Sequence, residues 1–320
     1  MASAPVPDPE NQTEGEAIKP APPIFRPPEP ERVSISSSES FEFEDVRGFL
    51  AKRAAVVVTL LGDRDSGKST LICSIYDRFL HGPFANQRST GALTITGFEQ
   101  RAHLERLESG RTTPDTQHTS LGEGLRYFHL GMSPELQIEE SSAILISDRA
   151  GETYKNARGN PALVSSLVEL PIADYLVVLI DGKRLADLTT RAGALFPVRQ
   201  TLQMLADHQP SDANYQVQVV LTKVDLIEAA TDAVDLRVAF DEFEARLRDA
   251  FTSRFASLTF FEIAARPLVG DYAAAYGVDA LIKSWLVGPK KRLGVTATPL
   301  PARTEFDLLA DRPVAQESSE

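Results

Sequence analysis

Cysteine, long apolar runs and positive charge are all scarce in this sequence. The single cysteine, Cys73, excludes a framework of intrachain disulfides. Apolar runs stay strand-sized, too short to span a bilayer, and the first residues are not typical of a secretory signal. The net charge of −12 disfavours nucleic acid or an anionic membrane surface as the main partner. We therefore expect a soluble, cytoplasmic protein with no nucleic-acid partner and no integral membrane segment.

The most informative stretch is an octapeptide with two glycines, Gly-Asp-Arg-Asp-Ser-Gly-Lys-Ser at residues 62–69. It fits the pattern G-x-x-x-x-G-K-[ST], between a β-branched apolar run at 55–61 and apolar residues at helical spacing from residue 70. This context is typical of a P-loop, which binds phosphate through backbone N–H groups and the start of a helix. The alternative is a glycine loop that only turns the chain. The predicted nucleotide-binding residues of this segment are Gly62, Asp65, Ser66, Gly67, Lys68, Ser69 and Thr70.

The phosphate end of such a site needs a cation, a metal ligand and a group that contacts the γ-phosphate. Lys68 is a mobile cation for the β- and γ-phosphates, and the Ser69 hydroxyl is a ligand for Mg²⁺. After the apolar run 143–147, Asp148-Arg-Ala-Gly151 fits D-x-x-G: Asp148 can hold Mg²⁺ through water, and the Gly151 N–H can contact the γ-phosphate. The alternative for so short a pattern is a plain strand-to-helix turn.

A threonine must also close over Mg²⁺ and the γ-phosphate, from a position between the first helix and the second strand. The sequence has Thr112, Thr113, Thr116 and Thr119 there. We predict Thr116, with Thr119 as the second choice, because both lie close before the strand expected at 125–130. The predicted metal ligands are therefore Ser69, Thr116 and Asp148.

The nucleotide base is expected at the segment that follows the apolar run 217–222. The sequence Thr222-Lys223-Val224-Asp225 places a carboxylate that can accept two hydrogen bonds from the donor edge of guanine, an edge that adenine lacks. Lys223 can lay its stem over the base plane. The usual form of this motif is N-K-x-D, and Thr222 keeps a hydroxyl to brace the P-loop. The alternative is an Asp225 that caps the next helix.

A small-residue loop after the run 258–263 completes the predicted base contacts. Its sequence is Ala264-Ala265-Arg266, where GTP-binding proteins often have S-A-K, with a backbone N–H that reaches guanine O6. Ala265 and Arg266 fit the last two places, and Ala264 replaces the serine.

Apolar strands alternate with amphipathic helices along the middle of the chain. This predicts an α/β fold with a mostly parallel, six-stranded sheet and helices on both faces, and together with the P-loop it fits a P-loop NTPase. Ligands of such sheets bind at the carboxyl ends of the strands. The expected strands are 55–61, 125–130, 143–147, 175–180, 217–222 and 258–263, and the expected helices are 70–80, 98–107, 161–170, 194–208, 234–255 and 278–286.

Composition divides the chain into three parts. Residues 1–51 are rich in Pro, Glu and Ser and predict a disordered tail, although the apolar side chains of 41–50 would let that part dock onto the domain edge. Residues 52–287 form the predicted nucleotide-binding domain, and residues 288–320 a mobile tail.

These motifs, in this order, resemble the translation-factor-related, Ras-like class of P-loop GTPases, over about residues 52–286. Residues 89–101, 114–119 and 148–152 also resemble a bacterial double-GTPase group linked to conflict and defence systems. The resemblance implies a GTP-binding and GTP-hydrolysing switch that uses Mg²⁺, alternates between GTP and GDP, and orders residues 111–121 and 148–157 around the γ-phosphate. Its implied partners are a protein effector or a second GTPase, or a second copy in a nucleotide-dependent homodimer.

The catalytic residues that this resemblance implies are Lys68, Thr116, Gly151 and Glu152. Glu152 stands where small Ras-like enzymes have a glutamine that orients the attacking water. A carboxylate there is repelled by the γ-phosphate unless Mg²⁺ or an arginine screens it, so Glu152 either positions water through such a screen or leaves hydrolysis slow. Arg111 and Arg149 are candidate arginine fingers, and a solvated side chain is the alternative for each. His118 has no partner at ligand spacing, and we predict no zinc site.

Two other functions fit parts of this pattern. A non-hydrolysing, guanine-nucleotide-dependent scaffold is favoured by Glu152. A P-loop kinase or ATPase is disfavoured because it leaves residues 222–225 and 264–266 without a role.

Overall fold

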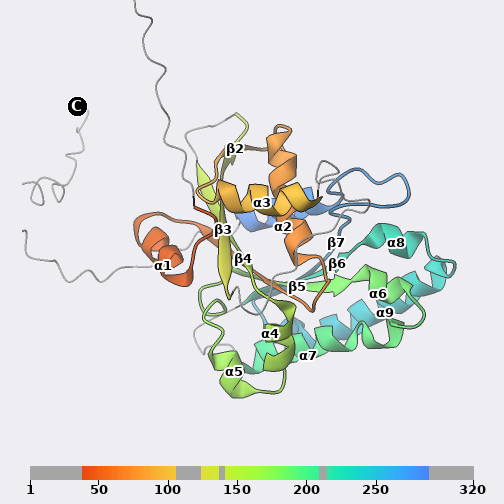
Figure 1. Cartoon of the computed structure of the whole chain (residues 1–320). Helices are drawn as coiled ribbons and strands as arrows, with labels where there is room; N and C mark the ends of the chain where they lie inside the picture. The colour runs from red at the N-terminus through yellow and green to blue at the C-terminus, as the bar shows by residue number, and fades with distance from the viewer. Residues whose placement is uncertain (1–37, 106–123, 137–140, 209–214, 288–320) are drawn as a thin grey trace, which may run out of the picture. The chain divides into compact units, whose positions relative to one another are not determined.

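A computed structural model describes residues 38–105, 124–136, 141–208 and 215–287, which centre on a seven-stranded sheet of order β2-β3-β4-β1-β5-β6-β7. The five strands from β4 to β7 in this order pair in parallel, and β2 and β3 add an antiparallel edge (Figure 1). This confirms the predicted α/β fold with a mostly parallel sheet. The strands are β1 Val56–Leu61, β2 Gln87–Gly91, β3 Arg126–Pro134, β4 Ser142–Asp148, β5 Tyr175–Asp181, β6 Gln216–Thr222 and β7 Ser257–Glu262.

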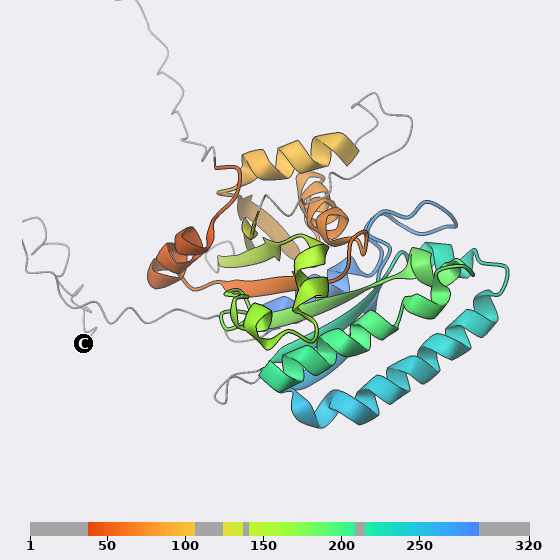
Figure 2. The same cartoon turned by 60° about the horizontal axis from the view of Figure 1, so that its bottom comes forward.

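Helices cover both faces of the sheet, as Figures 1 and 2 show. One face packs on α2 (Lys68–Leu80), α3 (Ile95–Glu105) and α10 (Val278–Val287), around the fully buried Trp285. The other packs on α4 (Gly151–Ala157), α5 (Pro161–Ser165), α7 (Phe196–His208) and α9 (Ala233–Phe251). Short helices α6 (Gly182–Ala186) and α8 (Val224–Glu228) follow β5 and β6, and η3 (Arg191–Gly193) and η4 (Thr252–Arg254) are single 3₁₀ turns.

The prediction of six strands was wrong by one. Strand β2, Gln87–Gly91, lies in a region expected to be loop, and its residues are half-buried or exposed. None of its side chains is fully buried, so no apolar run marks this edge strand in the sequence.

The helix predicted at 161–170 was too long. Helix α5 ends at Ser165, and turns then bring Leu167 and Leu170 into the core. The Ser166 hydroxyl donates to the carbonyl oxygen of Leu163 at 2.6 Å, a side-chain bond that competes with continuation of the helix. Leu163 is 41% exposed, so the three leucines do not share one buried stripe.

Residues 41–51, assigned by composition to the N-terminal tail, belong to the folded domain. Phe41 exchanges two backbone hydrogen bonds with Tyr127 of β3, both 2.9 Å long. Helix α1, Phe43–Lys52, then buries Val46 and Leu50 completely against this end of the sheet. The domain therefore begins upstream of residue 52. Residues 41–50 pack on the edge of the domain, as their apolar side chains allowed.

No helix among the described residues combines the length and the apolarity needed to cross a membrane.

Burial of His129 on β3 predicts a pH-dependent stability. Its Nδ1 accepts a hydrogen bond from the Leu93 N–H at 3.1 Å, and burial lowers the pKa of His129 to about 4. Between this value and the ordinary pKa of about 6.5, His129 binds a proton in the unfolded chain but not in the folded protein. The free energy of unfolding therefore falls as the pH drops through that window, by up to about 3 kcal/mol. Urea unfolding at pH 7 and pH 4.5 measures the loss.

The matched variant for this prediction is His129→Asn, whose amide oxygen can take over the bond from Leu93. Carboxylates elsewhere in the protein also titrate in this window. The informative quantity is therefore the difference between the wild type and the variant in the stability that each loses from pH 7 to pH 4.5. Parallel pH profiles for the wild type and the variant would contradict the assignment to His129.

Candidate nucleotide-binding site

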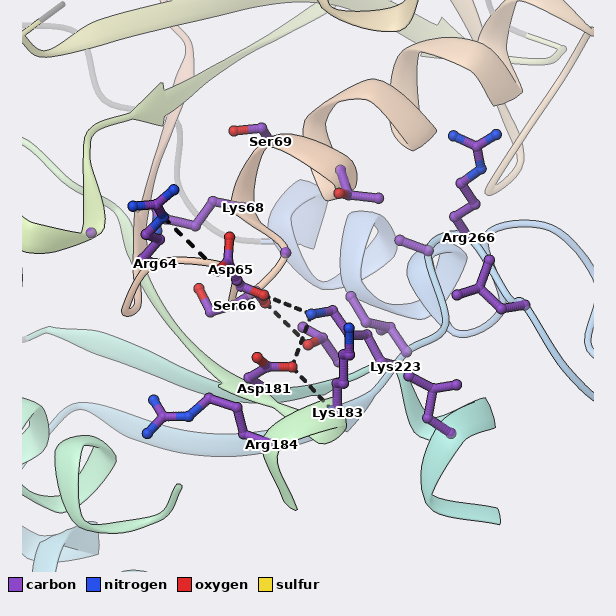
Figure 3. Close-up of a pocket in the computed structure, with 18 of the residues that line it drawn as sticks. Arg64, Asp65, Ser66, Lys68, Ser69, Asp181, Lys183, Arg184, Lys223 and Arg266 are labelled. Carbon is purple, nitrogen blue, oxygen red and sulfur yellow. Dashed lines mark hydrogen bonds and ion pairs between the residues drawn. The ribbon is translucent and has the colours of Figure 1, made fainter. Parts of the chain in front are cut away.

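One pocket lies at the carboxyl ends of the parallel strands, where the P-loop and the segments after β5, β6 and β7 meet (Figure 3). Its volume is about 610 Å³. Lys68 and Asp225, which are far apart in the sequence, both line it. The pocket brings together most of the sequence-predicted residues: Asp65, Ser66, Gly67, Lys68, Ser69, Thr70, Gly151, Thr222, Lys223, Asp225, Ala265 and Arg266.

Three of the predicted residues that the structure describes do not line this pocket. Gly62, the first residue of the P-loop, lines a separate small cavity, and a Cβ on it would clash with the Ser66 side chain. Asp148 is fully buried behind the loop, and Glu152 lies one residue beyond Gly151 in α4. Thr116 lies outside the described residues, as do Thr112, Thr113, Thr119, Arg111 and His118.

The P-loop keeps its shape through two left-handed residues and a brace from β6. Asp65 and Gly67 have φ angles of 64° and 94°, a region that glycine tolerates and aspartate adopts more readily than most residues. The Thr222 hydroxyl lies 3.0 Å from the carbonyl oxygen of Ser66 and 2.9 Å from that of Ile180, and it can donate to one of them at a time. Thr222 therefore contacts the P-loop through the hydroxyl that the sequence analysis assigned to bracing.

Lys68 is folded back onto the loop that precedes it. Its Nζ donates to the carbonyl oxygens of Gly62 at 2.9 Å and Asp63 at 3.0 Å, and its side chain is buried. Burial lowers the pKa of Lys68, while the negative charges of Asp148, Glu152 and Asp65 act in the opposite direction. The ammonium group is thus held at one end of the pocket and faces carboxylates from three segments.

The oxygens of Ser69 and Asp148 fit a hard divalent cation. The Ser69 hydroxyl lies 3.5 Å from Oδ2 of Asp148. Hydroxyl and carboxylate oxygens are suitable ligands for Mg²⁺, which keeps several waters and takes further ligands from substrate phosphates. The described residues contain no group of three or more His, Cys, Asp and Glu suited to a metal, and Mg²⁺ bound in this way needs none.

The segment after β4 abuts the P-loop directly. Gly151 begins α4, and a Cβ on this residue would lie 2.5 Å from the carbonyl carbon of Asp63 and collide with the backbone N of Arg64. Both clashing groups are backbone, so no side-chain rotation relieves them. Glycine is therefore required where this segment meets the phosphate loop.

Arg149 is not the solvated arginine that the sequence left as an alternative. Its Nε lies 3.0 Å from Oε1 of the fully buried Glu169, and its side chain is 16% exposed. Burial raises the pKa of Glu169, and the charge of Arg149 opposes that rise. The Tyr154 hydroxyl donates to the same carboxylate oxygen at 3.2 Å. A buried network thus anchors the D-x-x-G segment beside the pocket.

At the other end of the pocket, Asp225 is held by the loop that follows β7. Its side chain is 2% exposed, and Oδ2 accepts a hydrogen bond from the Leu268 N–H at 2.8 Å. Helix α8 has no side-chain hydrogen bond at its N-cap, so the structure gives no support to a helix-capping role for Asp225. Asp225, Ala265, Arg266 and Leu268 line the same pocket.

Lys223 links the two ends of the pocket. It has a left-handed backbone with a φ of 56°, and its Nζ donates to the carbonyl oxygen of Asp65 at 2.7 Å and to Oδ1 of Asp181 at 2.9 Å. In Figure 3 Lys223 and Asp181 point toward each other, and Arg184 lies on the far side of Asp181.

Residues at the end of β5 and just after it were missed by the sequence analysis. Asp181, Lys183 and Arg184 line the pocket, and the Asp181 carboxylate also accepts from the Lys183 N–H at 3.0 Å. Arg184 and Arg158 both form ion pairs with Asp63 of the P-loop. Only the position of this segment could have identified it from the sequence, because it follows a predicted strand as the other motifs do.

The family comparison agrees with this arrangement. A sequence profile of the Double-GTPase 2 family matches residues 56–286. No curated protein matches the chain in sequence.

Several solved structures are similar in fold. The GTPase-like domain of Saccharomyces cerevisiae Ski7, bound to GDP and inorganic phosphate, is 17% identical with a TM-score of 0.48, and the match covers 76% of this chain and 51% of that one. The signal recognition particle receptor SRb with GTP and SRX, from Chaetomium thermophilum, is 17% identical with a TM-score of 0.41. That match covers 72% of this chain and 99% of the receptor chain. The chain thus spans about half the length of the Ski7 chain.

Proposed function

The chain belongs to the Double-GTPase 2 family, and on this basis we propose that it is a Mg²⁺-dependent molecular switch that binds GTP and GDP and hydrolyses GTP. The observation that carries the proposal is that Lys68 and Asp225 line one pocket of about 610 Å³. A triphosphate at the P-loop and a guanine at Asp225 fit its two ends. A place in a bacterial conflict, defence or signalling system follows only from the resemblance of three sequence stretches.

In this mechanism the phosphates bind to backbone N–H groups of the P-loop and to Lys68. Ser69 and Asp148 would hold Mg²⁺, with Thr116 as the predicted third ligand. The metal, when bound, neutralises charge that develops on the β- and γ-phosphate oxygens. Gly151 would place its N–H at the γ-phosphate, and Glu152 would orient the attacking water.

At the base end, Asp225 would accept two hydrogen bonds from guanine, while Ala265 and Arg266 would supply backbone N–H groups toward its O6. The Leu268 N–H fixes the orientation of the carboxylate before the base binds. Lys223 would lie along the base plane, since its ammonium group is already tied to Asp65 and Asp181.

The second candidate function is a non-hydrolysing scaffold that responds to guanine nucleotides. It is favoured by Arg149, which lines the pocket but whose guanidinium is already paired with the buried Glu169. Single-turnover phosphate release with Mg²⁺ and GTP separates the two functions. Release above the buffer rate supports the switch that hydrolyses GTP, and its absence supports the scaffold.

Base recognition is tested by Asp225→Asn. We expect its preference for GTP over ATP to fall by about ten- to a hundredfold, because hydrogen bonds to a charged group contribute about 1.5–3 kcal/mol. The amide should also favour xanthosine triphosphate, whose base has a carbonyl where guanine has an amino group. Calorimetric titration of the three nucleotides measures both effects.

The matched control for this test is Asp235→Asn, which removes an exposed carboxylate from α9. It should leave all three affinities unchanged. A wild-type protein that binds ATP as tightly as GTP would contradict guanine recognition by Asp225.

A further inference from the structure

Arg101, near the end of α3, reaches the carboxylate that we assign to Mg²⁺. Its Nη2 lies 3.3 Å from Oδ2 of Asp148, the same oxygen that lies 3.5 Å from the Ser69 hydroxyl. Asp148 is fully buried and the Arg101 side chain is 15% exposed, so this ion pair is largely shielded from solvent. A guanidinium therefore stands at the oxygen where the metal is expected.

On its other side, Arg101 borders a second set of carboxylates. Its guanidinium carbon lies 4.6 Å from the ring centroid of Phe128, a cation–π contact that holds the end of the side chain in place. Beside it is a cavity of about 520 Å³, here named the polar cavity, which lies between α1, α3 and β3. The cavity is lined by Glu39, Ser40, Glu42, Asp45, Gln100, Arg101 and Arg126.

We propose that Arg101 is a two-position counter-ion that competes with Mg²⁺ for Asp148. Without the metal, its guanidinium neutralises the buried carboxylate. When Mg²⁺ binds with the nucleotide, two cations at one oxygen repel each other, and the guanidinium turns to the carboxylates of the polar cavity. Arg101 thereby weakens Mg²⁺ binding below what Ser69 and Asp148 alone would provide.

The geometry supports this exchange in two ways. Phe128 gives the guanidinium a contact that does not depend on Asp148. Apart from Arg101 itself, the lining of the polar cavity has three carboxylates and one arginine, Arg126, which is paired with Glu42, so it is net acidic and can receive a displaced positive charge. This inference rests on the proposed function, because it presumes a Mg²⁺–nucleotide complex.

The test is a calorimetric titration of Mg²⁺ into the GDP complex. Arg101→Gln should bind Mg²⁺ about tenfold more tightly than the wild type, on the scale of one partly buried charge-assisted contact. The double variant Glu39→Gln/Glu42→Gln should bind it about threefold more weakly, because the displaced guanidinium loses part of its second environment. Arg88→Gln, which removes an exposed positive charge on β2, should stay within about twofold of the wild type, on the scale of a surface charge.

Tighter Mg²⁺ binding in Arg101→Gln together with weaker Mg²⁺ binding in the double variant indicates that Arg101 competes with the metal. Unchanged or weaker Mg²⁺ binding in Arg101→Gln, or tighter binding in the double variant, would overturn it. A large loss of hydrolysis in Arg101→Gln with unchanged Mg²⁺ affinity would also overturn it, because the arginine would then act on the phosphates. GDP affinity without Mg²⁺, measured on the same samples, tests nucleotide binding separately, and its absence in the wild type contradicts the proposed function itself.

Discussion

Replacement of Lys68 by methionine should lower the affinity for GTP by about a thousandfold. The ammonium group is expected to contact two phosphates, and each charge-assisted hydrogen bond contributes about 1.5–3 kcal/mol, so the loss of both corresponds to about 10²–10⁴ in affinity. Its position supports this role, since Nζ is already held at the P-loop carbonyl oxygens of Gly62 and Asp63. Methionine retains the length and packing of the buried stem.

The control for Lys68→Met is Lys183→Met, which removes a second lysine that lines the same pocket. Lys183 is exposed and follows β5, so its loss should change the affinity by less than about fivefold, the scale of a solvated charge. Melting temperatures without nucleotide show whether each variant is folded. A folded Lys68→Met protein with nearly wild-type GTP affinity would contradict phosphate binding at this loop.

The parts of the fold that could be predicted from the sequence are those whose local pattern matches their environment. Strands β1 and β5 are buried along their whole length, so they appear as continuous apolar runs. Strand β2 has no such pattern, because it is a polar edge that depends on pairing with β3. Helix α1 combines both cases, since its two buried residues, Val46 and Leu50, were visible only as sparse apolar positions beside a polar tail.

The candidate site divides in the same way. Residues 62–70 and 222–225 were predicted because each works as a contiguous motif after a strand. Leu268 and Arg101 were not, because their contacts with Asp225 and Asp148 join segments that no local pattern connects. Asp181 is intermediate: its place at the end of β5 was predictable, but its ion pair with Lys223 depends on the parallel register of β5 and β6.

Substitution of Gly151 by alanine should separate nucleotide binding from hydrolysis. The added methyl group would collide with the backbone at Asp63 and Arg64, so the start of α4 must move away from the P-loop. The N–H of residue 151 would move with it and lose the contact that we propose it makes with the γ-phosphate. We expect hydrolysis to fall by about 10²–10³, the effect of losing one preorganised donor to a transition state, while GDP, which lacks the γ-phosphate, binds with little change.

The matched control for Gly151→Ala is Gly48→Ala in α1, where a Cβ would meet no atom within 4 Å. Single-turnover phosphate release gives the rates, and titrations with GDP and a non-hydrolysable GTP analogue give the affinities. The decisive quantity is the preference for the analogue over GDP, which should decrease only in Gly151→Ala. If GDP binding falls as much as analogue binding, the methyl group has distorted the P-loop itself, and the assignment of the Gly151 N–H to the γ-phosphate is wrong. If only the affinity for the GTP analogue falls, the contact between α4 and the P-loop is what distinguishes GTP from GDP.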